Sequence, residues 1–375
     1  MLREMTNNAT EPVTVAATAA TTPGLVCAHH HLYSALARGM PAPPKQATDF
    51  GEILEQVWWR LDCALDLDMI YWSAKLGALE ALESGTTCII DHHESPNAIE
   101  GSLDVIAKAC AEVGVRVSCT YGVTDRHSAT GRIPVENQPA ATLRPRAMTA
   151  AAKRGLDENV RFLKAGGRGY VGVHAAFTCA DETLEAVAAT AKELRRGVHI
   201  HVSEGRADAD AGTRLERYID DDWLLVHCVY LDREVRGTIA HNPRSNMNNA
   251  VGYASPAKRS NRIVLGTDGI GADMLDEFRV AYARHRESDV TASPDTAWSW
   301  LTNSYDLFPE ARNDEVVWSY SPMEPWHLAF SPGVRPVSVR VDGVEVVTNG
   351  QASRIDRAEI LARSREQAKR LFSRL

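Results

Sequence analysis

The sequence predicts a protein of the α/β class whose main unit is a (β/α)8 barrel. Eight short apolar runs occur along the chain, and most are separated by stretches in which apolar residues recur with helical spacing. This alternation is typical of a parallel sheet covered by helices. Six of the eight runs end in His or Asp, and in a TIM-like barrel the C-terminal strand ends form the face that carries the active site. These polar residues should therefore meet at one mouth.

The predicted strands are short and mainly aliphatic. They span residues 25–28, 86–90, 115–120, 170–173, 198–201, 224–226, 238–240 and 263–265. Helical spacing, with Gly85 and Gly114 as stops, predicts the helices. We expect them at residues 52–66, 68–83, 103–113, 156–165, 181–194, 273–286, 295–303 and 356–374. Residues 127–150 lack strong periodicity and predict a long loop of the kind that often covers a site.

The two ends of the chain predict a second, smaller unit. Residues 337–341 and 344–347 alternate apolar and polar side chains around an Asp-Gly turn, which predicts a hairpin. Residues 13–15 could add a short strand. We therefore divide the chain into three parts. Residues 1–22 and 331–355 are expected to form a small β-sandwich, residues 23–330 the barrel, and residues 356–375 a C-terminal helix.

Composition narrows the class of partner. The chain has 375 residues, 44% of them hydrophobic, and a formal net charge of −8, so nothing favours nucleic acid or an anionic membrane. No apolar run reaches the ~18 residues of a membrane span, and no signal peptide is expected. Seven cysteines without paired spacing indicate reduced thiols and a cytoplasmic protein, with Cys88 and Cys119 as core residues. A small-molecule substrate is expected, and a homo-oligomer is compatible with the sequence.

Histidines at strand ends predict a metal centre. His29 and His31 are two residues apart on one strand, so both leave the same face, whereas His30 points the other way. His201 ends the fifth predicted strand and Asp268 follows the eighth. Three imidazoles and a carboxylate suit Zn²⁺, and suit Fe²⁺ almost as well. We expect one divalent metal, with Zn²⁺ preferred and Fe²⁺ as the alternative.

Three residues near this centre could move protons. Zn²⁺ can lower the pKa of a bound water to about 7, and Asp268 could orient or deprotonate that water. Glu204, just past His201, could carry the proton to the leaving group, and His227 could hydrogen-bond the attacking hydroxide. Taken singly, Asp268 could be a helix cap and Glu204 a solvated loop charge. Their joint placement at strand ends favours a catalytic site.

Four further residues are candidate substrate contacts, each with a plainer alternative. Residues 170–173 hold no lysine to bridge two metals, which leaves His174, at the end of that strand, free to bind substrate or to be a satisfied strand-end histidine. Trp59 could line an aromatic wall or pack in the core. Arg244 could clasp a carbonyl or carboxylate, or face solvent beside capping residues. Arg126 is another polar candidate. His92, His93 and His241 could be core residues or could orient ligands.

The same residues carry a family resemblance. Residues 23–31, 199–204, 225–227, 245–246 and 266–268 resemble the amidohydrolase superfamily, in the branch of cytosine and guanine deaminases and triazine chlorohydrolases. Within that branch the chain is similar to the SsnA-type aminohydrolases, through residues 32–34, 58–62, 90–93, 95–96, 124–126 and 244–249. The resemblance covers residues 23–310. It implies one divalent metal held by His29, His31, His201 and Asp268, proton transfer assisted by Glu204 and His227, and a substrate contact at His174.

The resemblance also sets the functional hypotheses. The family has more N-terminal strands, so the β-sandwich is expected to be reduced, and the connections after residues 227 and 240 look short. The first hypothesis is a metal-dependent hydrolase of non-peptide C–N bonds, in which metal-bound hydroxide deaminates an amino-substituted purine, pterin, pyrimidine or triazine. An alternative is that the same site opens a cyclic amide or displaces chloride. Another is a metal-binding barrel without turnover.

Overall fold

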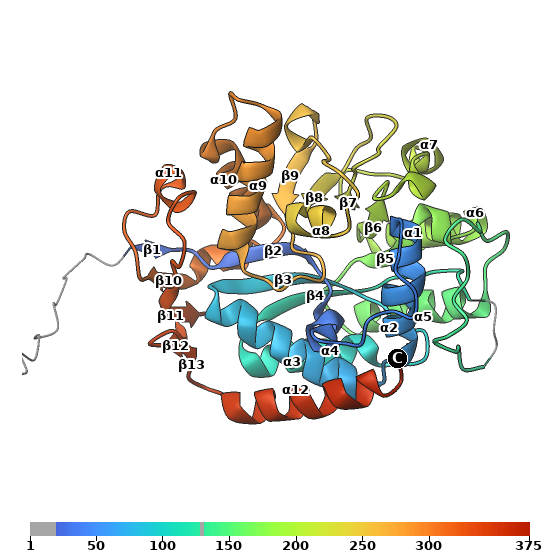
Figure 1. Ribbon diagram of the computed structural model, residues 1–375, viewed down its shortest axis with the longest axis horizontal. Coiled ribbons are helices and arrows are strands. Elements are labelled where there is room, and N and C mark those ends of the chain that lie inside the picture. The colour runs from blue at the N-terminus through green and yellow to red at the C-terminus, as the bar shows by residue number, and fades with distance from the viewer. Residues whose placement is uncertain (1–19, 128–130) are drawn as a thin grey trace, which may run out of the picture.

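The computed structural model describes residues 20–127 and 131–375, and its main unit is a barrel of eight parallel strands (Figure 1). Hydrogen bonds join them into two sheets, β2-β3-β4 and β5-β6-β7-β8-β9. Isolated bridges between Val123 and Val173 and between His30 and Asp268 link the sheets into a closed cylinder. The predicted (β/α)8 barrel is therefore confirmed. Its strands are β2 (Leu25–His30), β3 (Thr86–His93), β4 (Arg116–Tyr121), β5 (Val171–Ala175), β6 (Val198–Val202), β7 (Leu224–His227), β8 (Thr238–His241) and β9 (Arg262–Leu265).

The barrel strands are buried on both faces, and alternate residues supply two core layers. One face of each strand packs under the helices, while the other fills the barrel interior, as expected from strand periodicity. Apolar side chains fill one end of the barrel interior, and Tyr305, Phe308 and Ala311 pack against them. Apolar packing thus occupies one end of the cylinder, and histidines follow at the C-terminal strand ends. The interior apolar residues on strands are Val26, Ala28, Cys88, Ile90, Leu224, Val226, Ala240 and Val264.

Helices cover the outside of the barrel (Figure 1). Side-chain caps fix several starts: Asp66 accepts from the amide of Met69 before α3, and Thr149 accepts from that of Ala152 before α5. Because of this cap, α5 begins six residues before the predicted start at 156. The helices are α1 (Phe50–Ile53), α2 (Trp59–Ala64), α3 (Leu67–Glu83), α4 (Ser102–Val113), α5 (Ala150–Lys164), α6 (Asp181–Leu194), α7 (Ala211–Leu215), α8 (Pro243–Asn248), α9 (Met274–Ser288), α10 (Pro294–Thr302), α11 (Pro325–Leu328) and α12 (Arg357–Phe372).

Two stretches depart from regular α-helix or strand. A π-helical turn over Leu54–Trp58 joins α1 to α2, so the predicted helix at 52–66 is interrupted where it faces the barrel mouth. Residues 131–149 contain no helix or strand, in agreement with the predicted loop, while residues 128–130 of that loop lie outside the described part of the chain. The connection from β7 to β8 also contains no helix, as its short length predicts.

The terminal segments form a separate antiparallel sheet beside the barrel (Figure 1). Its strands, in the order β1-β10-β11-β12-β13, are β1 (Thr21–Thr22), β10 (Glu315–Trp318), β11 (Pro336–Val341), β12 (Val344–Thr348) and β13 (Gln351–Ala352). The predicted hairpin is confirmed, and its turn has positive φ at both Asp342 and Gly343, as a two-residue hairpin turn requires. The expected β-sandwich stays a prediction, since the possible strand at residues 13–15 lies outside the described residues. β10 also joins this sheet from within the range assigned to the barrel.

Two general features complete the fold. Helix α12 packs against α3 and so ties the C-terminal segment to the barrel (Figure 1). All seven cysteines are buried free thiols, including Cys88 and Cys119, which were predicted as core residues. Across residues 20–127 and 131–375, the helices include none with the length and apolar character that a membrane crossing requires.

Candidate metal centre and active site

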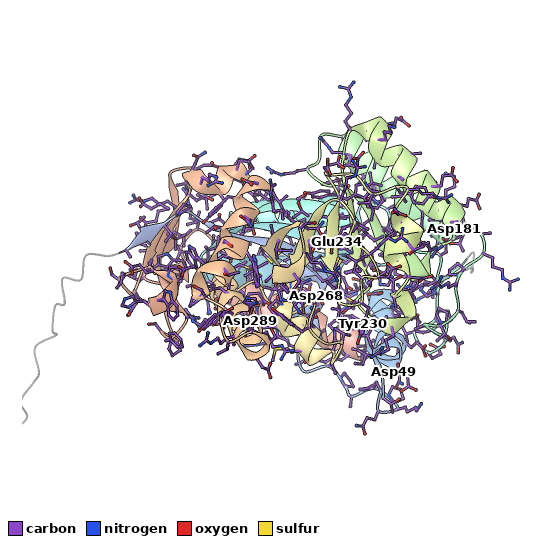
Figure 2. All side chains as sticks on the ribbon, turned by 90° about the horizontal axis from the view of Figure 1, so that it is seen from above. Asp49, Asp181, Tyr230, Glu234, Asp268 and Asp289 are labelled. Carbon is purple, nitrogen blue, oxygen red and sulfur yellow. The ribbon has the colours of Figure 1, made fainter. Side chains whose placement is uncertain are left out.

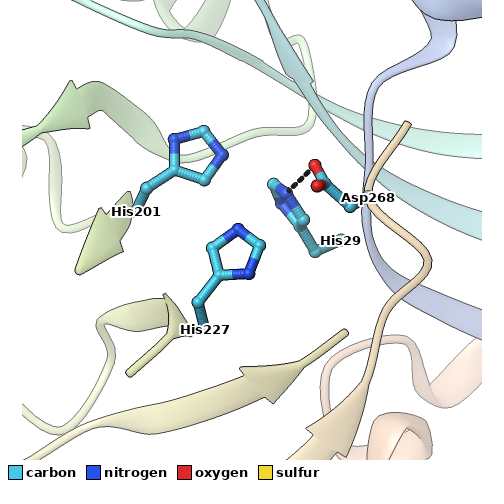
Figure 3. Close-up of side chains that lie close together, drawn as sticks. All are labelled: His29, His201, His227 and Asp268. Carbon is cyan, nitrogen blue, oxygen red and sulfur yellow. Dashed lines mark hydrogen bonds and ion pairs between the residues drawn. The ribbon is translucent and has the colours of Figure 1, made fainter. Parts of the chain in front are cut away.

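Ligand-type side chains from different strands meet at the C-terminal end of the barrel. Donor atoms of His29, His201, His227 and Asp268 all lie within 4.8 Å of one another, and Figure 3 shows their side chains converging. His31 joins them, since its Nε2 lies 2.9 Å from Asp268 Oδ1 and 3.2 Å from His201 Nε2. All of these residues are buried. The four side chains predicted as ligands are therefore together, and His227 lies beside them.

The tautomers of the imidazoles leave a place for a cation. His31 Nδ1 donates to the carbonyl of His92 at 2.5 Å, and His201 Nδ1 donates to that of His174 at 2.7 Å. In the neutral rings the lone pairs are then on the two Nε2 atoms, which face each other. With Asp268 Oδ1 adjacent, three electron-pair donors converge and repel unless they share a positive charge. This donor set fits a divalent metal ion.

A β-bulge brings His29 into the cluster. The register between β2 and β3 shifts between Cys27 and His30, so β2 has one extra residue there. As a result, Ala28 packs in the barrel interior while its neighbour His29 also faces inward, with Nε2 3.3 Å from Asp268 Oδ1. His29 Nδ1 lies 2.9 Å from His199 Nε2, which fixes the orientation of the ring.

The pKa values of these groups follow from burial and mutual charge. Burial lowers the pKa of His29 to about 3 and holds that of His201 well below its usual value, so both rings are neutral. Burial also lowers the pKa of His31, but the hydrogen bond and charge of Asp268 outweigh it and raise that pKa to about 9. Burial raises the pKa of Asp268, yet hydrogen bonds from His29 and His31 hold it well below its usual range. The cluster therefore favours a positive charge at its centre.

Glu204 and His227 form a pair beside the cluster. His227 Nε2 lies 3.4 Å from Glu204 Oε2. Burial, and then the charge of Asp268, raise the pKa of Glu204 well above its usual value, which favours the protonated acid. Burial lowers the pKa of His227, which favours the neutral ring. A carboxyl group and an imidazole thus lie side by side at the edge of the ligand cluster.

Short helix α8 supplies polar residues whose role the sequence did not reveal. Ser245 Oγ donates to Asp268 Oδ2, and His227 Nδ1 donates to Asn246 Oδ1 at 2.7 Å. Asn249 Nδ2 lies 3.5 Å from Glu204 Oε1 and 3.3 Å from Ser245 Oγ. One alternative interpretation of the sequence was that Ser245, Asn246 and Asn248 are the residues that cap a helix beside a solvent-facing Arg244. Their spacing just after a strand-end histidine was the available signal, but it did not identify their partners.

A small cavity opens above the cluster. His31, His201, Glu204 and Asp268 line its metal end; aromatic and acidic residues line the rest. The predicted substrate contacts Trp59 and His174 are both in this wall. The remaining lining residues are Tyr33, Phe50, Leu54, Trp58, Asp62, Glu94, Asn249 and Gly269.

A wider depression adjoins the cavity and shares Phe50, Leu54 and Asn249 with it. It also contains Asp49 and Tyr230, which lie to one side of Asp268 in the view from above (Figure 2). The site cavity therefore continues outward, toward the loops that follow β2 and β7.

Arg126 lies behind the cavity wall rather than in the cavity. Its Nη2 atom is 3.0 Å from Asp62 Oδ2 and 2.6 Å from Glu94 Oε2, and its guanidinium lies over the Trp59 ring at 4.6 Å. Glu94 Oε1 is in turn 3.5 Å from His174 Nε2. Sequence analysis singled out Arg126 as a substrate contact but not the two carboxylates that hold it. Asp62 and Glu94, rather than Arg126, line the cavity.

The structure does not bring Arg244 to this cavity. The Arg244 guanidinium pairs with buried Glu277 on α9 and donates to the carbonyl of Gly271 at 3.2 Å. The partner lies 33 residues further along the chain, so local spacing could not reveal it. The alternative prediction, that Arg244 faces solvent, does not hold either, because most contacts of its side chain are with buried groups.

The other strand-end histidines take supporting positions. His30 Nδ1 lies 3.0 Å from Thr267 Oγ1, on the face away from the cluster, as its strand position predicts. His92 donates to the carbonyl of Val173 at 2.9 Å and forms a second group of close donors with His31 and His201. His93 contacts Ser95, and His241 packs against Tyr253 and Trp300.

Comparison with known proteins identifies the family. Residues 20–303 match the amidohydrolase family. Since this match covers well over half of the 375 residues, the chain belongs to the amidohydrolase family, as the sequence motifs predict.

Curated relatives and solved structures of similar proteins include several deaminases. The chain is 29% identical to a 5'-deoxyadenosine deaminase of Methanopyrus kandleri, over 94% of this chain and 86% of the relative. It is also 29% identical, with the same coverage, to a 5-methylthioadenosine/S-adenosylhomocysteine deaminase of Desulforudis audaxviator. A zinc-containing adenosine deaminase of Xanthomonas campestris shares the fold, with a TM-score of 0.78, 21% identity, and 95% and 86% of the two chains covered.

An atrazine chlorohydrolase of Arthrobacter aurescens, solved with zinc and atraton, also shares the fold. Its TM-score is 0.75 at 19% identity, over 93% of this chain and 88% of that one. Both structural neighbours support the barrel fold alone. Their identity to this chain is too low to transfer an activity.

Proposed function

We propose that the protein is a metal-dependent aminohydrolase that removes an exocyclic amino group from a nitrogen heterocycle and releases ammonia. The observation that carries the proposal is the convergence of three imidazoles and Asp268 beside the carboxyl group of Glu204. The two deaminase relatives, each covering 94% of the chain, support an adenine-containing nucleoside as the first substrate class to test. The wider possibilities are the purines, pterins, pyrimidines and triazines.

We infer that His29, His31, His201 and Asp268 would hold one divalent cation. When bound, such a cation would supply Lewis acidity and make water acidic enough for attack near neutral pH. Three nitrogen ligands and one carboxylate suit Zn²⁺, which we propose first, with Fe²⁺ as the alternative. Elemental analysis of protein purified without chelator distinguishes the two metals.

Proton transfer is assigned to Glu204 and His227. Because the pKa of Glu204 is raised, its carboxylic acid can donate a proton to a ring nitrogen or to the departing amine. His227 donates through Nδ1 to Asn246, which leaves Nε2 free to accept a hydrogen bond or a proton beside Glu204. Asp268, whose Oδ1 lies 2.9 Å from His31 Nε2, is assigned to receive the proton of the attacking water.

Substrate binding is assigned to the cavity wall. Trp59 offers an aromatic face for a flat heterocycle, and His174, whose Nδ1 lies 2.8 Å from Thr178 Oγ1, can hydrogen-bond its edge. Arg126 is proposed to act through the acidic wall residues that it holds. Arg244 is left out of this assignment because Glu277 occupies its guanidinium.

Ammonia release tests the proposal. Zinc-loaded and iron-loaded protein would be assayed with adenosine, 5'-deoxyadenosine, guanine, a pterin and an aminotriazine. We expect ammonia from at least one compound, and its loss in Glu204→Gln but not in Glu185→Gln, a control at an exposed position of α6. Product masses separate the alternatives, because ring opening adds water without releasing ammonia and a chlorohydrolase releases chloride. Full activity in Glu204→Gln, or metal binding without any product, would contradict the proposal.

Two broader assignments complete the proposal. We propose that the five-stranded terminal sheet is a reduced form of a small β-sandwich. The seven free, buried thiols support a cytoplasmic location, where thiols stay reduced.

A further inference from the structure

Helix α8, with the residue that ends it, contacts all three groups proposed to move protons. The contacts join Ser245 to Asp268, Asn246 to His227 and Asn249 to Glu204. A helix this short has few internal hydrogen bonds, so its position depends on contacts with the rest of the chain. Whatever fixes α8 therefore also fixes the partners of the three groups.

The first turn of α8 is capped from a different helix. Amides in the first turn of a helix have no partner within that helix. Asn242, the residue before α8, provides no side-chain hydrogen bond to them. Instead, the backbone amide of Arg244 donates to Glu277 Oε1 at 3.1 Å. Glu277 lies on α9 and its side chain is fully buried, so α9 supplies the cap that the preceding residue does not.

The side chain of Arg244 extends this connection to the segment that carries Asp268. Its Nε atom pairs with Glu277 Oε2, and its Nη2 atom donates to the carbonyl of Gly271 at 3.2 Å. Gly271 belongs to the segment that follows β9, three residues beyond Asp268. One arginine thus joins α8, α9 and the Asp268 segment.

The Asp268 segment needs such contacts because its backbone is strained. The φ angle of Asp268 is 54°, in the left-handed region that residues with a side chain seldom adopt. A strained conformation of this kind persists only where its surroundings hold it. Arg244 binds the carbonyl of Gly271, and Ser34 Oγ donates to the carbonyl of Gly269 at 2.9 Å. These two side chains hold the backbone just after Asp268.

We propose that Arg244 and Glu277 form a positioning clamp, which keeps α8 and the Asp268 segment in the arrangement that proton transfer requires. The inference rests on the proposed function, because it concerns the groups of that same site. The contacts of the clamp are with residues that do not line the cavity, so it acts through α8 and not on substrate. Without the clamp, the hydrogen bonds from α8 to the site should loosen. The chemical step should then suffer more than substrate binding.

Arg244→Met tests the clamp by kinetics. The substitution keeps an unbranched apolar stem and removes the guanidinium. We expect kcat to fall about tenfold or more, as when a partner that orients a site is removed. KM should stay within about twofold, because the variant removes no contact to substrate.

Arg116→Met is the matched control. Arg116 pairs with Asp314 at the N-terminal end of β4, away from the active-site mouth. The side chains of this pair are 19% and 0% exposed, against 21% and 0% for Arg244 and Glu277. Loss of either arginine therefore leaves one buried carboxylate and should lower Tm by a similar amount. Only Arg244→Met should lower kcat.

A double variant tests whether Arg244 and Glu277 act as one unit. Arg244→Met and Glu277→Gln should each lower kcat, and losses that come from one clamp should not add. We expect kcat of the double variant to lie within about twofold of that of Arg244→Met. Losses that multiply would overturn the clamp. The double variant leaves no unpaired charge at this position, so it keeps the test available where a single variant fails to fold.

The tautomer of His227 gives a readout that needs no turnover. In the wild type its Nδ1 atom carries the proton that Asn246 Oδ1 accepts. Nitrogen NMR of histidine-labelled protein distinguishes this form from the one protonated on Nε2, and the signal is identified by its loss in His227→Gln. We expect the Nε2-protonated form to appear in Arg244→Met and not in Arg116→Met.

Unchanged kcat in Arg244→Met, an unchanged His227 tautomer, or equal effects of the two arginine variants would each overturn the clamp. This failure differs from failure of the proposed function. Ammonia release that Arg244→Met leaves unaltered would refute the clamp alone. A tautomer change specific to Arg244→Met, in a protein that releases ammonia from no substrate, would refute the aminohydrolase and leave the clamp standing.

Discussion

The two ends of the site cavity handle buried carboxylates in different ways. At the metal end, Asp268 faces imidazole nitrogens, and its close partners among the described residues include no Lys or Arg. At the other end, Asp62 and Glu94 both contact Arg126, so a cation is built into the protein. A buried carboxylate needs a positive partner. The comparison teaches that the proposed metal site would need a cation from solution, whereas the acidic wall depends on one from the chain itself.

Removal of the metal should have the largest effect, because it separates the two ends most clearly. We expect chelation to abolish activity and zinc to restore it. For a metal at 100 times its dissociation constant, the linked stabilisation is about 2.7 kcal/mol. This corresponds to a fall in Tm of roughly 3 °C for a protein of this size. Calorimetry of the apo and reloaded protein measures it. An unchanged Tm and full activity in the apo protein would contradict the assignment of the cluster as a metal site.

Loss of the Glu204 proton should have the next largest effect. We expect Glu204→Gln to lower kcat by about 10²–10⁴-fold, the usual contribution of general acid–base catalysis. Metal content should stay unchanged, because Glu204 is not among the proposed ligands. Steady-state kinetics and elemental analysis on one preparation test both parts. Loss of the metal together with activity would instead make Glu204 part of the metal end.

Asn246 should matter less, since it acts by orienting His227. Its Oδ1 accepts from His227 Nδ1 at 2.7 Å. We expect Asn246→Ala to lower kcat about tenfold, at the low end of losses for residues that orient a site. Asn248→Ala, at an exposed position of the same helix, is the matched control. Equal kinetics in the two variants would show that the contact has no catalytic consequence.

The pH dependence of stability should show the smallest effect, and it concerns the acidic wall. Burial raises the pKa of Glu94 from 4.5 to about 8. Between these values the native protein keeps a proton that the unfolded chain releases, so stability falls as pH rises through this window. We expect a shallower fall in Tm for Glu94→Gln than for wild type. Parallel pH profiles of Tm in the two proteins would contradict this cause.

The sequence predicted the metal end better than the acidic wall, for a physical reason. Strand ends of a barrel meet at one face, so His201, His227 and Asp268 could be grouped from their positions after apolar runs. The bulge that turns both Ala28 and His29 inward was not predicted, because periodicity describes one strand and not its register against a neighbour. His29 and His31 were grouped from their spacing on one strand alone, without knowledge of the bulge.

Long-range ion pairs were the main gap in the prediction. Asp62, Glu94 and Arg126 come from separate segments, and Arg244 pairs with a residue on a different helix. Arg126 and Arg244 were predicted as candidate substrate contacts, and local sequence does not reveal the distant carboxylates that pair with them. The choice of partner depends on how the loops fold over the mouth of the barrel. The start of α5 was missed in a similar way, because its Thr149 cap lies in a stretch without periodicity.

The bridge between His30 and Asp268 has a consequence for how the molecule assembles. This bridge links the first and last strands of the cylinder, and the amide of Asp268 donates to the carbonyl of His29 at 3.1 Å across it. The strand contact that closes the barrel therefore runs through the proposed metal ligands. Closing the cylinder and assembling the proposed metal site would then be one folding event. Slow amide hydrogen exchange at this contact should consequently depend on the bound ion.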